Sequence, residues 1–187
     1  MHPRALLPAL VLLSLLAVGA GCTADPARSP TVSTVRADAA LTAPEVLASF
    51  VPPAPPGWRL LAPPSSVSLE EDGMPLTSVT ASYLRDSGPN GTGSTDADLT
   101  IQDTGGRSAG LRRLVDRLAA APADGAAPAR TMLRGQPAYV LDDGRMTGAY
   151  VVVGDRYVVW LAVTGGTRAD FDAFVAALDL EGLAEQR

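Results

Sequence analysis

The sequence predicts an α+β domain in which helices pack on an antiparallel β-sheet. Eight short runs rich in β-branched and aromatic residues are separated by glycine, proline and aspartate, as in strands joined by turns. Helical segments interrupt these runs in the order helix, four strands, helix, four strands, helix. A meander of antiparallel strands with helices packed on it is the economical architecture for this order.

The first half of the domain is expected to hold one short helix and four strands. Thr42 can cap the helix, and Pro44 suits its first turn because proline has no N–H to leave unpaired. The apolar side chains of this helix that should face inward are Val46, Leu47 and Phe50. The four strands are expected at 58–61, 67–69, 77–84 and 97–103. Alternation in the last two places five residues inward, namely Val79, Ala81, Tyr83, Leu99 and Ile101.

The second half begins with the clearest helix, at 108–120. Its apolar stripe consists of Leu111, Leu114, Val115 and Leu118. Strands are expected at 131–133, 137–141, 146–153 and 157–163. The runs 150–153 and 157–163 are apolar on both faces and should be central strands. A closing helix starts at Thr167, with Asp170 completing a capping-box-like pair. Its buried stripe should be Phe171, Phe174, Val175 and Leu178.

Residues 1–21 are predicted to be a signal peptide. Arg4 supplies a positive charge, residues 5–18 form a continuous apolar run, and Gly19-Ala20-Gly21 places small residues before Cys22. The apolar run is shorter than the roughly 20 residues that a transmembrane helix needs. Residues 22–40 are small and polar and are expected to form a flexible tether, followed by a single domain at 41–187.

The junction at Cys22 resembles the lipobox of bacterial lipoproteins, with Gly19 standing where that family usually has leucine or another branched apolar residue. The resemblance implies cleavage before Cys22, lipidation of its thiol and acylation of the new amino terminus. Such chains anchor a protein stably, at about 0.8 kcal/mol for each buried methylene. We therefore expect a lipoprotein on the extracytoplasmic face of the cell membrane or envelope. The alternative is cleavage after Ala20, which would leave a secreted soluble protein.

Composition excludes several functional classes. The chain has 15 basic and 20 acidic residues, a formal net charge of −5, one cysteine, one histidine and no lysine. Because His2 lies in the predicted signal, the mature chain lacks the residues that most catalytic triads and zinc sites use. The acidic balance argues against nucleic acid as a partner. We expect no catalytic residue, no metal site and no cofactor.

Several stretches allow both a turn and a functional interpretation. Asp142-Asp143 before Gly144 is a carboxylate site or a hairpin turn, and turn chemistry favours the hairpin. Asp103, before Gly105-Gly106, is interpreted as a turn or helix-start residue. Gly165-Gly166-Thr167 can hold an anion at a helix N-terminus. It has no phosphate-loop lysine, so a strand-to-helix turn is predicted.

Two further features concern exposed surface. In the loop 86–96, Asp86, Asn90 and Gly91 match a calcium-loop register, but Ala97 stands where a bidentate glutamate belongs. We interpret this loop as a solvated hairpin loop. The basic stripe of the middle helix, formed by Arg112, Arg113 and Arg117, is a solvated face or a site for an acidic partner, and we favour the first.

The two tryptophans complete the candidates. Trp58 and Trp160 are both expected in the core, Trp160 more firmly because it lies within an apolar strand.

The C-terminal half carries a second resemblance. Its landmarks are Gly135-Gln-Pro-Ala-Tyr139, a hairpin, Val151-Val-Val-Gly-Asp-Arg-Tyr-Val-Val-Trp160, and a closing helix ending Ala177-Leu-Asp-Leu180. In its order of elements over residues 56–180, the chain is similar to the Mog1/PsbP-like group. That resemblance implies a sheet sandwiched by helices and an adaptor or accessory role, and it transfers no functional residue.

Three functions follow from these observations, in order of preference. The first is a non-enzymatic binding or accessory domain for an unknown protein, with an apolar or arginine-lined patch left uncovered. The second is a carrier of a lipid or other apolar ligand, which requires an enclosed cavity. The third is a carboxylate-based enzyme, which requires two converging acidic groups with shifted pKa values.

Overall fold

The computed structural model describes residues 40–71, 74–85, 95–106 and 128–186, all within the compact unit that spans 35–187. The predicted signal, Cys22, the tether before residue 40 and the expected helix at 108–120 lie outside these residues. Within the described residues, no helix is long and apolar enough to cross a membrane.

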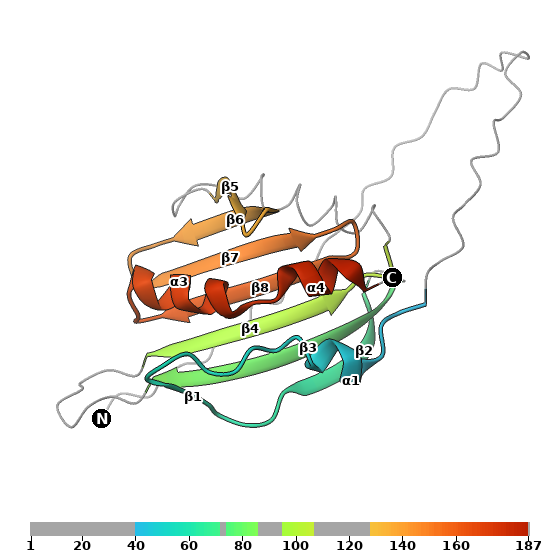
Figure 1. Ribbon diagram of the computed structural model, residues 1–187, viewed down its shortest axis with the longest axis horizontal. Helices are drawn as coiled ribbons and strands as arrows, with labels where there is room; N and C mark the ends of the chain where they lie inside the picture. The colour runs from blue at the N-terminus through green and yellow to red at the C-terminus, as the bar shows by residue number, and fades with distance from the viewer. Residues whose placement is uncertain (1–39, 72–73, 86–94, 107–127, 187) are drawn as a thin grey trace, which may run out of the picture. The chain divides into compact units, whose positions relative to one another are not determined.

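One sheet of eight strands forms the centre of the domain, and every pair of neighbouring strands is antiparallel (Figure 1). The strands are β1 (Trp58–Leu60), β2 (Ser65–Glu71), β3 (Met74–Arg85), β4 (Asp96–Asp103), β5 (Ala129–Leu133), β6 (Gln136–Asp142), β7 (Met146–Val153) and β8 (Tyr157–Thr164). Their order is β1-β3-β4-β8-β7-β6-β5, and β2 also pairs with β3. The α+β class and the antiparallel sheet are therefore confirmed.

The order of strands departs from a simple meander at two places. Strands β5 to β8 follow one another as a meander, but β8 then lies beside β4, which comes much earlier in the chain. Strand β3 is long enough for two partners along one edge, with β2 pairing at 74–80 and β1 at 83–85. Strands β7 and β8 are central, as their apolar sequences predict.

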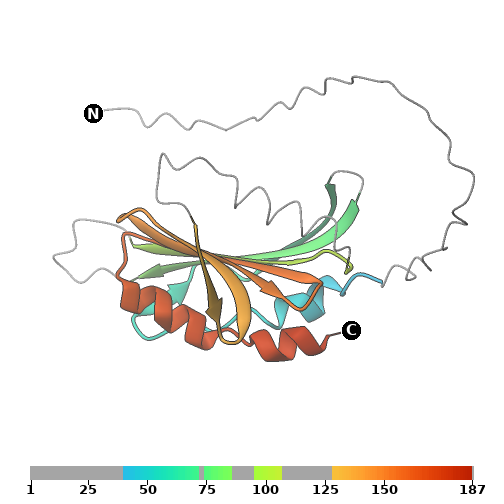
Figure 2. The same ribbon diagram turned by 90° about the horizontal axis from the view of Figure 1, so that it is seen from above.

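The described helices all cover the same face of the sheet (Figure 2). They are α1 (Pro44–Ala48), α3 (Arg168–Ala177) and α4 (Leu180–Glu185). Helix α1 contacts β2 and β3, α3 contacts β7 and β8, and α4 contacts β7. The inward residues expected on β3 and β4 are all buried in the core between this face and the helices. The stripe expected on the closing helix, Phe171, Phe174, Val175 and Leu178, is buried there too.

Two expectations for α1 are wrong. Val46 is exposed and only Leu47 is fully buried, because successive side chains of a helix point about 100° apart and α1 turns Leu47 toward the core. Phe50 lies beyond the helix and packs partly against the core. The N-cap residue is Ala43, which makes no side-chain cap, and the Thr42 hydroxyl instead lies 2.9 Å from the Tyr157 hydroxyl.

The closing helical segment consists of two helices rather than one. Leu178 adopts an extended conformation that ends α3, and the Asp179 carboxylate then accepts a hydrogen bond from Gly182 N at 2.9 Å to start α4. At the other end of α3 the predicted capping box is confirmed. The Thr167 hydroxyl accepts from Asp170 N, while the Asp170 carboxylate accepts from Thr167 N at 2.9 Å.

Replacing Thr167 with alanine should lower the free energy of unfolding by about 1 kcal/mol, because the first turn of α3 loses its side-chain acceptor. Urea denaturation of the purified protein measures this change. Thr164→Ala is the matched control, since Thr164 is an exposed residue at the end of β8 outside the cap. Equal losses in the two variants would contradict a capping role.

Candidate functional site

Asp103 is a fully buried carboxylate at the end of β4, with no exposed side-chain surface. Arg156 meets it with two donors, Nε at 2.8 Å from Oδ1 and Nη2 at 2.6 Å from Oδ2. The backbone N–H groups of Gly105 and Thr42 also donate to this carboxylate, at 2.8 and 2.6 Å. Both oxygens are therefore occupied, so Asp103 is not free to act as a general base.

The sheet brings these groups together from distant parts of the sequence. Asp103 faces inward because it continues the alternation of Leu99 and Ile101. Its partner in the sheet register is Tyr157, so Arg156 in the turn before β8 reaches the carboxylate directly. The Thr104 hydroxyl and backbone N–H donate to the Arg156 carbonyl at 2.6 and 3.1 Å, which fixes this turn.

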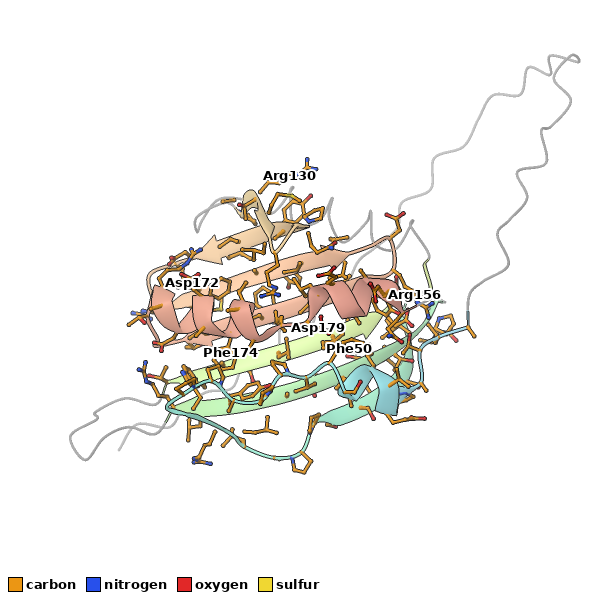
Figure 3. All side chains as sticks on the ribbon, in the orientation of Figure 1. Phe50, Arg130, Arg156, Asp172, Phe174 and Asp179 are labelled. Atoms are coloured by element: carbon orange, nitrogen blue, oxygen red, sulfur yellow. The ribbon has the colours of Figure 1, made fainter. Side chains whose placement is uncertain are left out.

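Thr42 and Tyr157 extend the contacts to both ends of the described domain. We call Thr42, Asp103, Arg156 and Tyr157 the Arg156 cluster. Arg156 Nη2 donates to the carbonyl of Ala40 at 2.7 Å, and the Tyr157 hydroxyl donates to the carbonyl of Gln186 at 3.0 Å. Figure 3 shows Arg156 at the end of the sheet where the described chain begins and ends, with Asp172 near the opposite end. The cluster therefore ties the first and last described residues to the two central strands β4 and β8.

Electrostatics reinforce this arrangement. Burial raises the pKa of Asp103, but hydrogen bonds from Arg156, Thr42 and Gly105 lower it more, so its pKa lies below the ordinary 3.8. The Asp103 carboxylate in turn raises the pKa of Arg156. The Arg156 guanidinium also lies 5.2 Å from the centre of the Tyr157 ring, within the range of a cation–π contact. The ion pair stays charged over the whole physiological pH range.

Acid should weaken the domain through Asp103. Because its folded pKa is below its unfolded value, this carboxylate stabilises the fold above pH 4 and loses that contribution as the pH falls through the folded pKa. We expect the unfolding free energy of the natural chain to fall more steeply below pH 4 than that of Asp103→Asn. Denaturation series from pH 2 to 7 measure both slopes. Parallel slopes would contradict the assignment.

A second charged contact lies at the opposite end of the sheet. Arg85 Nη1 is 2.6 Å from Asp170 Oδ2, and the Arg85 guanidinium is 5.9 Å from the centre of the Trp58 ring. Burial raises the pKa of Asp170, but hydrogen bonds from Thr167 and the charge of Arg85 lower it more. Trp58 and Asp170 are buried while Arg85 is partly exposed, so this contact covers one end of the core.

The aromatic residues show where the core is filled. Phe174 makes edge contacts with Trp58 and Tyr83, with ring centres 5.0 and 4.9 Å apart. The Tyr83 hydroxyl donates to the Pro52 carbonyl at 2.7 Å, and burial raises the pKa of Tyr83 to about 12. Neither Trp58 nor Tyr83 is available as an exposed docking residue. The expected ranking of the tryptophans is wrong, because Trp58 is buried in the core whereas Trp160 is partly exposed.

The turn interpretations of Asp142-Asp143 and of Gly165-Gly166-Thr167 are confirmed. Asp143 accepts from the N–H groups of Arg145 and Met146, and Asp142 accepts from Gly144 N, whose φ of 78° needs glycine. Gly165-Gly166-Thr167 joins β8 to α3 as predicted. The loop residues Asp86, Asn90 and Gly91 lie outside the described residues. So do the three arginines of the expected middle helix, Arg112, Arg113 and Arg117.

The interpretation of Asp103 as a turn or helix-start residue is incomplete. Its contact with Gly105 N does belong to a turn, but its main partner is Arg156, which lies far along the sequence. A signal was present, because alternation places Asp103 on the inward face of its strand. An acidic residue at such a position needs a cationic or donor partner. Nothing in the sequence singled out Arg156, which stands in an ordinary turn.

The acidic groups of the described ranges do not form a metal site, since no group of three or more potential ligands gathers there. Asp96 and Asp98 lie on one face of β4, where burial and the charge of Asp98 raise the pKa of Asp96. Asp98 is exposed and accepts a hydrogen bond from the Ser82 hydroxyl at 2.6 Å.

Comparisons of the chain with protein-family models, with curated protein sequences and with solved structures found no match.

Proposed function

We propose that this chain is an exported lipoprotein whose domain is held at the extracytoplasmic face of a membrane by lipid on Cys22. We further propose that the domain serves as a non-enzymatic binding or accessory module with a Mog1/PsbP-like arrangement. The observation that carries the proposal is the single cysteine of the chain, which directly follows an apolar run and small residues. The first described residues, which are the ones nearest to that cysteine in the sequence, are held in place by the Arg156 cluster.

A tether between Cys22 and Ala40 would keep the domain close to the bilayer. A flexible coil of this length spans roughly 20–30 Å, so the domain samples a thin layer above the membrane surface. A partner in the same layer is met at high effective concentration without a large interface. The proposed role therefore needs a firm connection between tether and fold, and the contacts of Ala40 and Thr42 with Arg156 and Asp103 are suited to it.

The carrier of an apolar ligand is the weaker alternative. A carrier needs an enclosed space of a few hundred Å3 between sheet and helix. The described layer between sheet and α3 is filled by Trp58, Tyr83 and Phe174 in direct ring contact. This packing favours binding at an outer surface of the domain.

The lipid anchor is tested by replacing Cys22 with serine in the full chain, expressed in a bacterial host that processes lipoproteins. The natural chain should incorporate an alkyne-labelled fatty acid and sediment with membranes, whereas Cys22→Ser should do neither. Gly19→Leu is the matched control at the same junction and should retain both. Mass spectrometry of the mature N-terminus provides the decisive reading, because an unmodified Cys22 or a start at another residue would overturn the proposal.

A further inference from the structure

Strand β2 forms an open edge of the sheet in the part of the chain that the structure describes (Figure 1). It pairs with β3 along one side, and no described strand lies along its other side. All side chains from Ser65 to Glu70 are exposed. An open strand edge presents a row of backbone N–H and C=O groups that can pair with a further strand. The backbone of β2 is therefore accessible for such pairing.

Exposed apolar side chains gather at this edge. Among the described residues six large apolar side chains are exposed, and five of them lie on α1, on β2, or at the end of β1 and just after it, namely Val46, Leu60, Leu61, Val67 and Leu69. Helix α1 contacts β2. Val67 and Leu69 are 49 and 40 % exposed and point to the same face, because they are two residues apart on one strand. A group of exposed apolar side chains indicates an interaction surface.

The opposite edge of the sheet is less suited to pairing. Strand β5 is only five residues long and carries the exposed, charged Arg130, and short edge strands and charges are devices that prevent edge pairing. Strand β2 is seven residues long and has neither a charge nor a proline from Ser65 to Leu69. Of the two edges, β2 is thus the one whose sequence permits a new strand.

The sequence of β2 fits a second copy of itself in an antiparallel register. Residues directly opposite each other in an antiparallel pair point to the same face. With a twofold axis at Ser68, Val67 lies opposite the partner's Leu69, so exposed apolar side chains cover each other. Ser66 lies opposite the partner's Glu70, where a hydroxyl can donate to the carboxylate. No like charges meet between these residues.

The position of the axis follows from the length of the strand. Ser68 is the middle residue of β2, so an axis there pairs all seven residues with the partner strand. An axis at Val67 or at Leu69 would leave two residues of each strand outside the pairing. It would also separate Val67 from the partner's Leu69.

We propose that the domain pairs with a second copy of this chain through β2, antiparallel and about a twofold axis at Ser68. The axis is perpendicular to the sheet, so the two sheets join into one and the helices of both copies lie on the same face. Because each copy uses the same edge, the assembly closes at two copies. Pairing does not require the proposed lipid anchor, although anchored copies would meet at a raised effective concentration.

Disulfide cross-linking tests the pairing and its register. In the full chain with Cys22→Ser, which removes the only thiol, Ser68→Cys places two thiols opposite each other across the axis. Their Cα atoms would be about 5 Å apart, within reach of a disulfide. Ser66→Cys is the matched control on the same strand and face, because its two copies would be offset by about 13 Å along the strands.

Oxidation of Ser68→Cys should give a disulfide between two chains in several-fold higher yield than oxidation of Ser66→Cys. Equal yields, or no product from Ser68→Cys, would overturn the proposal. A preferential cross-link from Ser68→Cys to another protein in the producing cells would overturn it as well, because β2 would then be the docking strand for that protein.

Sedimentation measures the association without a cross-link. The Cys22→Ser chain should approach twice the monomer mass as its concentration rises. Adding Val67→Lys should keep it monomeric, because a charge then replaces the apolar contact with the partner's Leu69. Met132→Lys is the control on β5, where Met132 is 60 % exposed, and should still dimerise. Circular dichroism of each variant checks that the fold is retained.

A Cys22→Ser chain that stays monomeric at every concentration would contradict the pairing, and so would equal dimerisation of the two lysine variants. If Val67→Lys fails to fold, the cross-linking yields decide. All of these chains lack Cys22, so a negative result counts against the pairing and leaves the proposed lipid anchor to its own test.

Discussion

Replacing Arg156 with alanine is expected to lower the free energy of unfolding by about 3 kcal/mol or more, because it leaves the Asp103 carboxylate buried without its cation. The side chain of Asp103 is 0 % exposed and that of Arg156 only 13 % exposed, so both charged groups are largely shielded from water. Urea denaturation at pH 7 measures the change. The neighbouring contacts of Thr42 and Gly105 with Asp103 remain and limit the loss.

The matched control is Arg168→Ala. Arg168 pairs with Asp172 at 2.9 Å, but both side chains are more than half exposed and lie one turn apart on α3. Such surface pairs contribute only a few tenths of a kcal/mol. A loss for Arg156→Ala as small as that for Arg168→Ala would show that the buried ion pair does not hold the fold together.

The same variant also tests the connection between tether and domain. Thr42 N–H donates to Asp103 at 2.6 Å, and Arg156 holds the carbonyl of Ala40. Hydrogen exchange at Thr42 should therefore accelerate in Arg156→Ala far more than exchange at Leu99 in the core. If exchange at both positions rises equally, the variant has lost global stability without a local release of the tether.

The strands can be predicted well from the sequence because the alternation of apolar and polar residues is a local signal. The inward residues of β3 and β4 and the apolar strands β7 and β8 were predicted from pattern alone, and burial agrees with them. The sequence does not reveal that β8 lies beside β4, because that pairing joins strands more than fifty residues apart. The ion pair of Asp103 and Arg156 depends on this pairing, so it was missed for the same reason.

Errors at the helices have a different origin. Val46 and Thr42 were assigned from helix rules, but α1 is only five residues long, so tertiary contacts outweigh its local preferences. The Thr42 hydroxyl bonds to the Tyr157 hydroxyl and accepts from Arg156 instead of capping the helix.

The error at Trp160 concerns a strand. Trp160 was expected in the core because its strand is apolar on both faces. An apolar pattern on both faces does not reveal which face of the strand packs against the helices. In the structure Val159 and Leu161 face the helices, and Trp160 lies on the opposite face of the sheet.

Phe174 should be the most sensitive apolar position of the described core. Its ring is 1 % exposed and touches both Trp58 and Tyr83, so Phe174→Ala removes two edge contacts and leaves a cavity beneath α3. We expect a loss of about 4 kcal/mol in the free energy of unfolding, by analogy with other buried phenylalanine truncations. Phe174→Leu should cost clearly less, because it fills part of the space.

Met132→Ala is the control for Phe174→Ala, since Met132 is 60 % exposed on the edge strand β5 and its truncation should be nearly neutral. Chemical denaturation of the three variants gives the comparison. The near-ultraviolet circular dichroism of Phe174→Ala should also weaken, because Trp58 and Tyr83 lose their fixed neighbour. Ordinary point substitutions lower the free energy of unfolding by about 1 kcal/mol. A smaller loss for Phe174→Ala would contradict a filled layer between the sheet and α3. Such a result would favour an adaptable interior and with it the carrier of an apolar ligand.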